Sequence, residues 1–202
     1  MQTIFLVRHG ETQWNAELRF QGKSDIGLNE EGFRQSRLLA KRLEKEKIDM
    51  AYSSPLERAL QTAEIITEPH NLSIITHSGL SERSHGAVEG MTKDEFREKY
   101  PKVWEEYEKT RELPGIKGIE TVEQSNERCT KAFIEIVKSN PGRNILIVAH
   151  GGANKGIIHE LTGKDYIKFH QHNCCLNIIK YDGRDFVFEK IDDISHLETE
   201  AY

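Results

Sequence analysis

The stretch Thr3-Ile4-Phe5-Leu6-Val7-Arg8-His9-Gly10 determines the architecture that the sequence predicts. Its β-branched, aliphatic and aromatic residues indicate a buried strand, and the Arg-His-Gly that follows places polar groups at the carboxyl end of this strand. A similar arrangement comes much later, where Ile145-Leu146-Ile147-Val148-Ala149 precedes His150-Gly151-Gly152. Functional residues of parallel sheets gather beyond the carboxyl ends of the strands. We therefore expect the two histidines to meet at one edge of a sheet.

Strand-like runs alternate with helical patterns through most of the chain. This alternation predicts an α/β fold, a three-layer α/β/α sandwich with a mainly parallel sheet. The dipeptide Asp182-Gly183 favours a tight hairpin between the last two strands, which adds an antiparallel edge strand. The expected strands cover residues 3–7, 49–53, 71–76, 144–149, 175–181 and 186–190, and the expected helices cover residues 29–47, 56–67, 93–100, 101–111, 121–139 and 153–161.

A charged, irregular stretch at about residues 80–120 interrupts the alternation. We interpret it as a small helical insertion, or cap, over the active site. Two aromatic residues on it, Trp104 and Tyr107, either line a substrate entrance or pack within the insertion, and packing is the more common role of such residues. With 202 residues, the whole chain (1–202) is expected to form a single domain.

Composition excludes several classes of protein. The 33 acidic and 28 basic residues give a net charge of −5, and no basic stripe suggests a nucleic acid partner. No apolar run is long enough to cross a membrane, and the N-terminus enters a strand without a signal-like segment. The three cysteines, of which two are adjacent, fit a reducing compartment. We expect a cytoplasmic protein with no membrane partner; the sequence leaves the oligomeric state open and permits a homodimer.

Four motifs carry the chemistry. They are R-H-G-E-T-x-W-N at residues 8–15, S-P-x-x-R-A-x-Q-T-A at residues 54–63, L-x-E-x-x-x-G-x-x-E-G at residues 80–90 and V-x-H-G at residues 148–151. A single histidine after a strand is more often structural, but the four motifs in this order resemble the histidine phosphatase superfamily, which also contains the cofactor-dependent phosphoglycerate mutases. The resemblance extends from Ile4 to about Tyr181.

The resemblance implies a phosphatase that works through a phosphohistidine. His9 would attack phosphorus, while Arg8, Arg58 and His150 would bind the charged oxygens of the transferring group. Glu82 would protonate the leaving alkoxide and then take a proton from water, which predicts a bell-shaped dependence of turnover on pH. The alternative is that Glu82 has no catalytic role and is a surface residue in a charged loop.

A second set of residues is predicted to bind the substrate. Asn15, Gln21 and Gly22 match positions that complete the phosphate pocket in the family, although loop residues of these types are often only turn formers. Arg83 would reach a carboxylate or second phosphate of the substrate, and Gly151 follows the second histidine. We expect neither a cofactor nor a metal: His170, His172 and the adjacent cysteines lack a second ligand pair with zinc spacing, and Ile157 stands where a phosphate-binding loop needs a lysine.

Two reactions are possible on such a site, because the phosphoenzyme can transfer its phosphoryl group to water or to a second phosphoglycerate. A mutase needs extra cations above the pocket, and the insertion here is short and contains no adjacent arginines. Against this, Ser81–Ala87 is more similar to the mutase version of its motif. We favour a phosphomonoester hydrolase that acts on a small phosphorylated metabolite, with a cofactor-dependent phosphoglycerate mutase as the alternative. A non-catalytic phosphate-binding module would be expected to lack His9 or Glu82.

Overall fold

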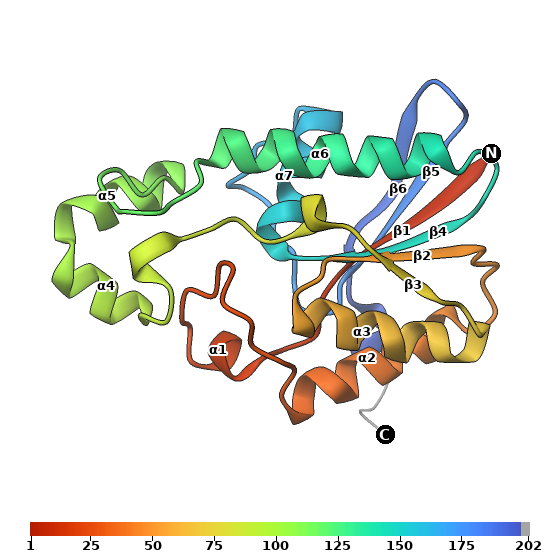
Figure 1. Cartoon of the computed structure of the whole chain (residues 1–202), viewed down its shortest axis with the longest axis horizontal. Coiled ribbons are helices and arrows are strands. Elements are labelled where there is room, and N and C mark those ends of the chain that lie inside the picture. Colours follow the sequence, from red (N-terminus) through yellow and green to blue (C-terminus); the bar gives the residue numbers. More distant parts are fainter. Residues whose placement is uncertain (199–202) are drawn as a thin grey trace.

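The computed structural model describes residues 1–198 and contains one six-stranded sheet (Figure 1). The strand order is β3-β2-β4-β1-β5-β6, and the β3-β2, β2-β4 and β4-β1 pairs are parallel, whereas β1-β5 and β5-β6 are antiparallel. The prediction of a mainly parallel sheet with an antiparallel edge is therefore confirmed. The strands are β1 (Gln2–Arg8), β2 (Met50–Ser53), β3 (Ile74–Thr76), β4 (Ile145–Ala149), β5 (Leu176–Tyr181) and β6 (Phe186–Asp193).

Helices cover both faces of the sheet and complete the expected three layers (Figure 1). On one face, α2 (Glu30–Leu43) and α3 (Glu57–Thr67) bury Phe5 and Val7 of β1. On the other face, α6 (Val122–Ser139) and α7 (Gly151–Thr162) bury Ile4 and Leu6. Successive residues of a strand point to opposite faces, so the continuous apolar run of β1 follows directly from its burial on both sides.

The register of β1 against β4 places the two histidines at the same level. Val7 pairs with Val148 and Arg8 pairs with Ala149, so each strand ends immediately before its histidine. The parallel pairing of two apolar runs thus brings His9 and His150 together, although 140 residues separate them along the chain.

The insertion has a small core of its own. Its helices α4 (Lys93–Lys99) and α5 (Pro101–Thr110) lie beside the sheet layers (Figure 1) and enclose Phe96. The ring of Phe96 contacts Phe20 at 5.2 Å and Trp104 at 5.9 Å between centroids. Because Phe20 belongs to the loop after β1, this cluster attaches the insertion to the loop that borders the site.

Short helical turns are the main elements that the sequence pattern did not predict. They are α1 (Gln13–Ala16) and the 3₁₀ turns at Glu68–His70, Ser78–Leu80, Gly86–Val88 and Ser195–Leu197. The expected strand at residues 71–76 is shorter in the structure, because Asn71 ends a 3₁₀ turn with φ of 52° and β3 begins only at Ile74. No helix within residues 1–198 combines the length and apolar character needed to cross a membrane.

Candidate active site

The two strand-end histidines lie side by side. The ring centroids of His9 and His150 are 5.1 Å apart, with the ring planes tilted by 59°, and both side chains are buried. They come from the first and the fourth strands, as the spacing of the motifs predicted, and α7 begins directly after His150.

One ring nitrogen of His9 is held by the backbone. Its Nδ1 lies 2.7 Å from the carbonyl oxygen of Gly10, and a carbonyl only accepts hydrogen bonds, so Nδ1 carries the proton. Burial, reinforced by the charges of Arg58 and Arg8, holds the pKa of His9 well below its usual range. The imidazole is therefore neutral near pH 7, and its lone pair is on Nε2. This is the state that a nucleophilic histidine requires.

The ring of His150 is held by a hydrogen bond at its Nε2 atom, whereas that of His9 is held at Nδ1. The Nε2 of His150 lies 2.8 Å from the hydroxyl of Ser54, which also accepts the backbone N–H of Leu56 and can give its own proton to the ring. Burial and the neighbouring Arg58 lower the pKa of His150 well below its usual range. In this arrangement Nδ1–H is a donor, and it is buried with no hydrogen-bond partner within residues 1–198.

Two guanidiniums flank His9, a buried one from Arg58 and a partly buried one from Arg8. Arg58 donates to the carbonyl oxygens of Gly22 and Ser24, both at 2.8 Å, and Arg8 donates to the carbonyl oxygen of Gln171. Burial lowers the pKa of Arg8 and lowers that of Arg58 to about 10, so both remain cations at pH 7. The Nε atoms of both arginines have no hydrogen-bond partner in the described part of the chain. Oriented, unpartnered donors on cations favour an anion at this place.

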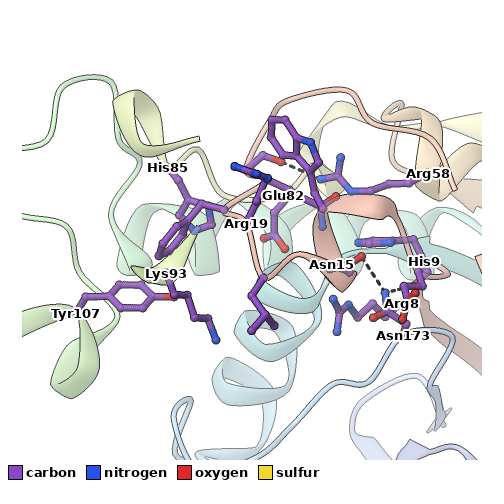
Figure 2. Close-up of a pocket in the computed structure, with 16 residues that line it drawn as sticks. Arg8, His9, Asn15, Arg19, Arg58, Glu82, His85, Lys93, Tyr107 and Asn173 are labelled. Carbon is purple, nitrogen blue, oxygen red and sulfur yellow. Dashed lines mark hydrogen bonds between the residues drawn. The ribbon is translucent and has the colours of Figure 1, made fainter. Parts of the chain in front are cut away.

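A cavity of about 390 Å³ opens in front of these groups (Figure 2). Its lining includes seven of the ten predicted site residues: Arg8, His9, Asn15, Gln21, Gly22, Arg58 and Glu82. His150 lies outside the lining and contacts the site through the ring of His9. In Figure 2 the sheet side of the cavity carries His9, Arg8 and Arg58, and the insertion side carries His85, Lys93 and Tyr107.

The carboxylate of Glu82 is held by two backbone donors. Its Oε1 accepts the N–H of Arg83 at 2.8 Å, and its Oε2 accepts the N–H of Gly152, in the first turn of α7, at 3.0 Å. An added methyl group at Gly152 would lie 2.4 Å from Oε1, so the close approach of the carboxylate needs a glycine there. Glu82 is thereby directed to the cavity that His9 also lines.

The loop after β1 closes the side of the cavity. Asn15 Oδ1 accepts the backbone N–H of Thr12 at 3.1 Å, and Gln21 Oε1 accepts the hydroxyl of Thr12 at 3.0 Å. Gly22 has φ of +54°, a left-handed conformation that favours glycine. The two amide groups thus help to hold the loop as well as to line the cavity.

The other two predicted substrate-binding residues, Gly151 and Arg83, line a second, adjoining cavity instead. Arg83 is 3% exposed; its guanidinium donates to the carbonyl oxygen of Arg111 and lies 3.6 Å from the carboxylate of Glu112. Arg83 therefore contacts the insertion and does not line the cavity in front of His9.

Three residues that the sequence analysis did not single out contribute to the site. Asn173 donates to the carbonyl oxygen of His9 at 3.1 Å and to Asn15 Oδ1 at 3.2 Å (Figure 2). Glu89 accepts hydrogen bonds from the loop at Ser24, and Ser54 contacts His150. Ser54 and Glu89 belong to the recognised motifs, so a signal for them existed; no pattern indicates Asn173.

The histidine-rich segment before β5 does not assemble a ligand set. The Nδ1 of His172 lies 2.6 Å from Asp192, and both neighbouring cysteines, Cys174 and Cys175, are buried free thiols. Within residues 1–198, no group of three or more histidine, cysteine, aspartate or glutamate side chains is arranged to hold a metal ion.

Comparison with known proteins identifies the family. The sequence model of the histidine phosphatase superfamily (branch 1) matches residues 4–194 of this chain. The chain belongs to this superfamily. Its resemblance to the family, inferred from four motifs, is thus confirmed over almost its whole length.

The names of individual relatives refer to both of the reaction types that the sequence suggested. The chain is 34% identical to phosphoglycerate mutase-like protein 4 of Arabidopsis thaliana, over 98% of this chain and 88% of that protein. It is 32% identical to phosphoserine phosphatase 1 of Hydrogenobacter thermophilus, over 98% and 95% of the two chains. Among solved structures, YhfR of Bacillus stearothermophilus superposes with a TM-score of 0.91 at 31% identity, over 98% of this chain and 100% of that one.

Proposed function

We propose that this member of the histidine phosphatase superfamily hydrolyses phosphomonoesters of small metabolites through a phosphohistidine on His9. The observation that carries the proposal is the state of His9: a neutral imidazole, with its proton held by Gly10 and its Nε2 lone pair free, between the guanidiniums of Arg8 and Arg58. The similarity to a phosphoserine phosphatase supports the same reaction.

In the first step, Nε2 of His9 would attack phosphorus while the ester oxygen leaves on the opposite side. Negative charge on the phosphoryl oxygens would be stabilised by Arg8 and Arg58, and by the unpartnered Nδ1–H of His150. Glu82, which lines the same cavity, would give its proton to the leaving alkoxide. The products are the free alcohol, a phosphohistidine and an ionised Glu82.

In the second step, water would attack the phosphohistidine. The ionised Glu82 would take a proton from this water, the N–P bond would break, and inorganic phosphate would leave. The two backbone hydrogen bonds that Glu82 accepts would hold its carboxylate in one position through both steps. His9 returns to its neutral form with the proton still on Nδ1.

A phosphoglycerate mutase is the second candidate, because a mutase-like protein is among the relatives and the adjoining cavity is rich in cations. The two reactions differ in the acceptor of the phosphoryl group. The absence of adjacent arginines anywhere in the sequence favours water.

The test has two parts. Rapid mixing with a ³²P-labelled monoester and quenching in alkali should trap an acid-labile, alkali-stable phosphoenzyme, and His9→Asn should trap none. Steady-state assays on a panel of phosphorylated metabolites, with and without 2,3-bisphosphoglycerate, should release inorganic phosphate without the bisphosphate. Isomerised product without phosphate release would establish the mutase, and an unlabelled wild-type protein would contradict the phosphohistidine.

We also propose a cytoplasmic location and a small phosphorylated metabolite as the binding partner, with no nucleic acid or membrane partner. The three cysteines support this location, since Cys129, Cys174 and Cys175 are all free and buried. A homodimer remains a prediction that size-exclusion chromatography with light scattering would test.

A further inference from the structure

Glu82, the proposed acid and base, lies in an irregular segment between the 3₁₀ turns Ser78–Leu80 and Gly86–Val88. Two hydrogen bonds hold its carboxylate, but its backbone lies outside the helices and strands. Leu80 is fully buried and Ser81 is 8% exposed, and the carbonyl groups of such a buried segment need hydrogen-bond donors from elsewhere in the protein. The place of the carboxylate therefore depends on the groups that bind the backbone on either side of Glu82.

Arg128 of α6 binds the backbone that precedes Glu82. Its Nη1 donates to the carbonyl oxygens of Gly79 and Ser81, both at 2.9 Å. The turn also packs closely on the same helix, because a methyl group added at Gly79 would lie 2.6 Å from Cβ of Ala132. Ser81 is the residue directly before Glu82, so Arg128 joins this side of the segment to α6.

Glu120 orients Arg128 and binds the backbone that follows Glu82. The Nε and Nη2 atoms of Arg128 donate to the two carboxylate oxygens of Glu120, each at 2.7 Å, and the ion pair is partly buried. Two parallel hydrogen bonds of this kind fix the direction of a guanidinium. The backbone N–H of Glu120 donates to the carbonyl oxygen of Ser84 at 3.0 Å, and its Oε2 accepts the N–H of Ser84 at 3.4 Å. The Glu120–Arg128 pair thus binds the segment on both sides of the proposed acid.

The pair lies outside the place where the reaction would occur. Arg128 lines neither the cavity at His9 nor the adjoining one, and it forms no ion pair with Glu82 within residues 1–198. Burial alone would lower the pKa of Arg128, but its hydrogen bonds to Glu120 and the nearby negative charges, that of Glu82 among them, raise it. Arg128 is therefore a cation and a hydrogen-bond donor at neutral pH.

We propose that Arg128, oriented by Glu120, is a positioning residue that holds the carboxylate of Glu82 at the ester oxygen of the substrate. This inference rests on the proposed function, in which Glu82 transfers the proton. An acid must lie within hydrogen-bond reach of the oxygen that it protonates, and a displacement of about 1 Å can cost about 100-fold in rate. The two guanidiniums that would bind the phosphate are held by other backbone groups. Loss of the pair should therefore slow proton transfer and leave phosphate binding unchanged.

The first experiment compares two substrates in Arg128→Gln. Glycerol 3-phosphate has an alkoxide leaving group that needs a proton, whereas the leaving group of p-nitrophenyl phosphate needs none. We expect kcat for glycerol 3-phosphate to fall about tenfold or more and its KM to stay within about twofold of the wild-type value. The burst of p-nitrophenol, which measures formation of the phosphoenzyme, should slow much less. Equal slowing with both substrates would overturn the proposal.

Lys131→Gln is the matched control. Lys131 is an exposed cation on the same helix and lines neither of the two cavities, so its substitution makes the same change in charge away from Glu82. The kcat and KM of this variant should equal those of the wild-type protein.

A second variant covers the case in which Arg128→Gln does not fold. The single substitution leaves the partly buried carboxylate of Glu120 without its partner, which is strongly destabilising. Glu120→Gln/Arg128→Gln removes both charges and, with them, the hydrogen bonds to the carbonyl oxygens. The same loss in kcat is expected from this double variant.

A double-mutant cycle separates positioning of the acid from general support of the fold. In the Glu82→Gln background no acid remains to be positioned, so adding Arg128→Gln should lower kcat by less than about twofold. A structural role of Arg128 predicts instead that the two losses multiply. Losses that multiply would contradict the positioning role.

Amide hydrogen exchange needs no turnover, so it separates this inference from the proposed function. The N–H of Gly152 donates to Oε2 of Glu82, and in the variants without Arg128 it should exchange faster by about tenfold or more, the change expected for one hydrogen bond to a charged group. The N–H of Ile157, farther along α7, is the reference, since a general loss of stability speeds both. Faster exchange at Gly152 alone supports the positioning role even if the wild-type protein releases no phosphate. Unchanged exchange at Gly152, or equal acceleration at both amides, refutes it and leaves the hydrolase in place.

Discussion

The Nδ1 atom of His9 lies 2.7 Å from the carbonyl oxygen of Gly10, the next residue in the chain. The proton position of the proposed nucleophile therefore depends on where the Gly10 backbone lies. That backbone is tightly packed: its N–H donates to the hydroxyl of Thr62 at 3.0 Å, and a methyl group added at Gly10 would lie 2.6 Å from the carbonyl oxygen of Gly32.

The first prediction concerns Gly10→Ala. The added methyl group meets backbone of α2, which cannot move aside cheaply, so we expect a loss of about 1–3 kcal/mol in the free energy of unfolding. A displaced carbonyl oxygen would also release His9 Nδ1, and kcat should fall by about tenfold or more. Urea denaturation and steady-state kinetics measure the two effects. Gly27→Ala is the control, because its methyl group would meet only side-chain atoms, of Gln61 and Glu57, at 3.2 Å or beyond. Full activity in Gly10→Ala would show that this hydrogen bond does not matter.

The second prediction concerns Glu82→Gln. A glutamine cannot give a proton to the leaving oxygen, so hydrolysis of alkyl phosphates should slow by about 100-fold or more, within the range of general acid catalysis. The leaving group of p-nitrophenyl phosphate needs no proton, so formation of the phosphoenzyme from it should slow much less. Burst kinetics with this substrate would then show a phosphoenzyme that accumulates, since water no longer has its base. Equal losses on both substrates would exclude Glu82 as the acid.

The positions of the histidines could be predicted from the sequence because the fold places them there through simple patterns. Two apolar runs buried on both faces pair in parallel, and the residue after each run lies at the same sheet edge. Arg8, Arg58 and Glu82 were found through motifs, and all three line the cavity. The strands and long helices followed from periodicity, with errors of a few residues at their ends.

The second cavity could not be predicted in the same way. Lys155 and Arg111 meet there only because the insertion packs through Phe96 against Phe20, a contact between segments far apart in the sequence. The helical periodicity of a short insertion does not predict against which part of the protein its helices pack. For the same reason, the contact of Arg83 with Glu112 could not be predicted, because it depends on how the insertion returns to the sheet. Its expected role in binding the substrate stays a prediction.

The third prediction concerns stability against pH. Burial lowers the pKa of His9 and His150 well below 6.5, and lowers that of His85 to about 3. The folded protein keeps these rings neutral, whereas the unfolded chain protonates them as the pH falls below about 6.5. The contribution of these rings to the free energy of unfolding is therefore fully present above this pH and is lost as the pH falls. The loss approaches about 1.4 kcal/mol per pH unit for each histidine, or about 4 kcal/mol per pH unit for all three.

Urea denaturation at pH 7.5, 6.5, 5.5 and 5.0 measures this slope. His85→Asn should reduce it by the equivalent of about one proton taken up on unfolding, or about 1.4 kcal/mol per pH unit. The carboxylates whose pKa is lowered, among them Glu31 and Asp193, have the same sign but act below about pH 4.5. A stability that stays constant from pH 7.5 to 5.0 would contradict the neutral state of the histidines.

The last prediction concerns Glu89, whose carboxylate joins the insertion to the loop after β1. Its Oε2 accepts the N–H of Ser24 at 3.0 Å and the hydroxyl of the same serine at 2.7 Å, while its Oε1 accepts the N–H groups of Lys23 and His85. The carbonyl oxygen of Ser24 in turn accepts a hydrogen bond from Arg58. Glu89 therefore acts on the phosphate pocket through the loop, as a positioning residue.

In Glu89→Gln an amide NH₂ replaces one oxygen and faces donors on one side, so the loop should shift and Arg58 should lose its fixed direction. We expect the KM for phosphomonoesters to rise about tenfold, with a matching loss in the affinity for inorganic phosphate as an inhibitor. Glu127→Gln, an exposed residue on α6, is the control and should change neither. If Glu89→Gln lowers the free energy of unfolding but leaves both constants unchanged, the carboxylate stabilises the fold without placing Arg58, because a purely structural role predicts no change in phosphate affinity.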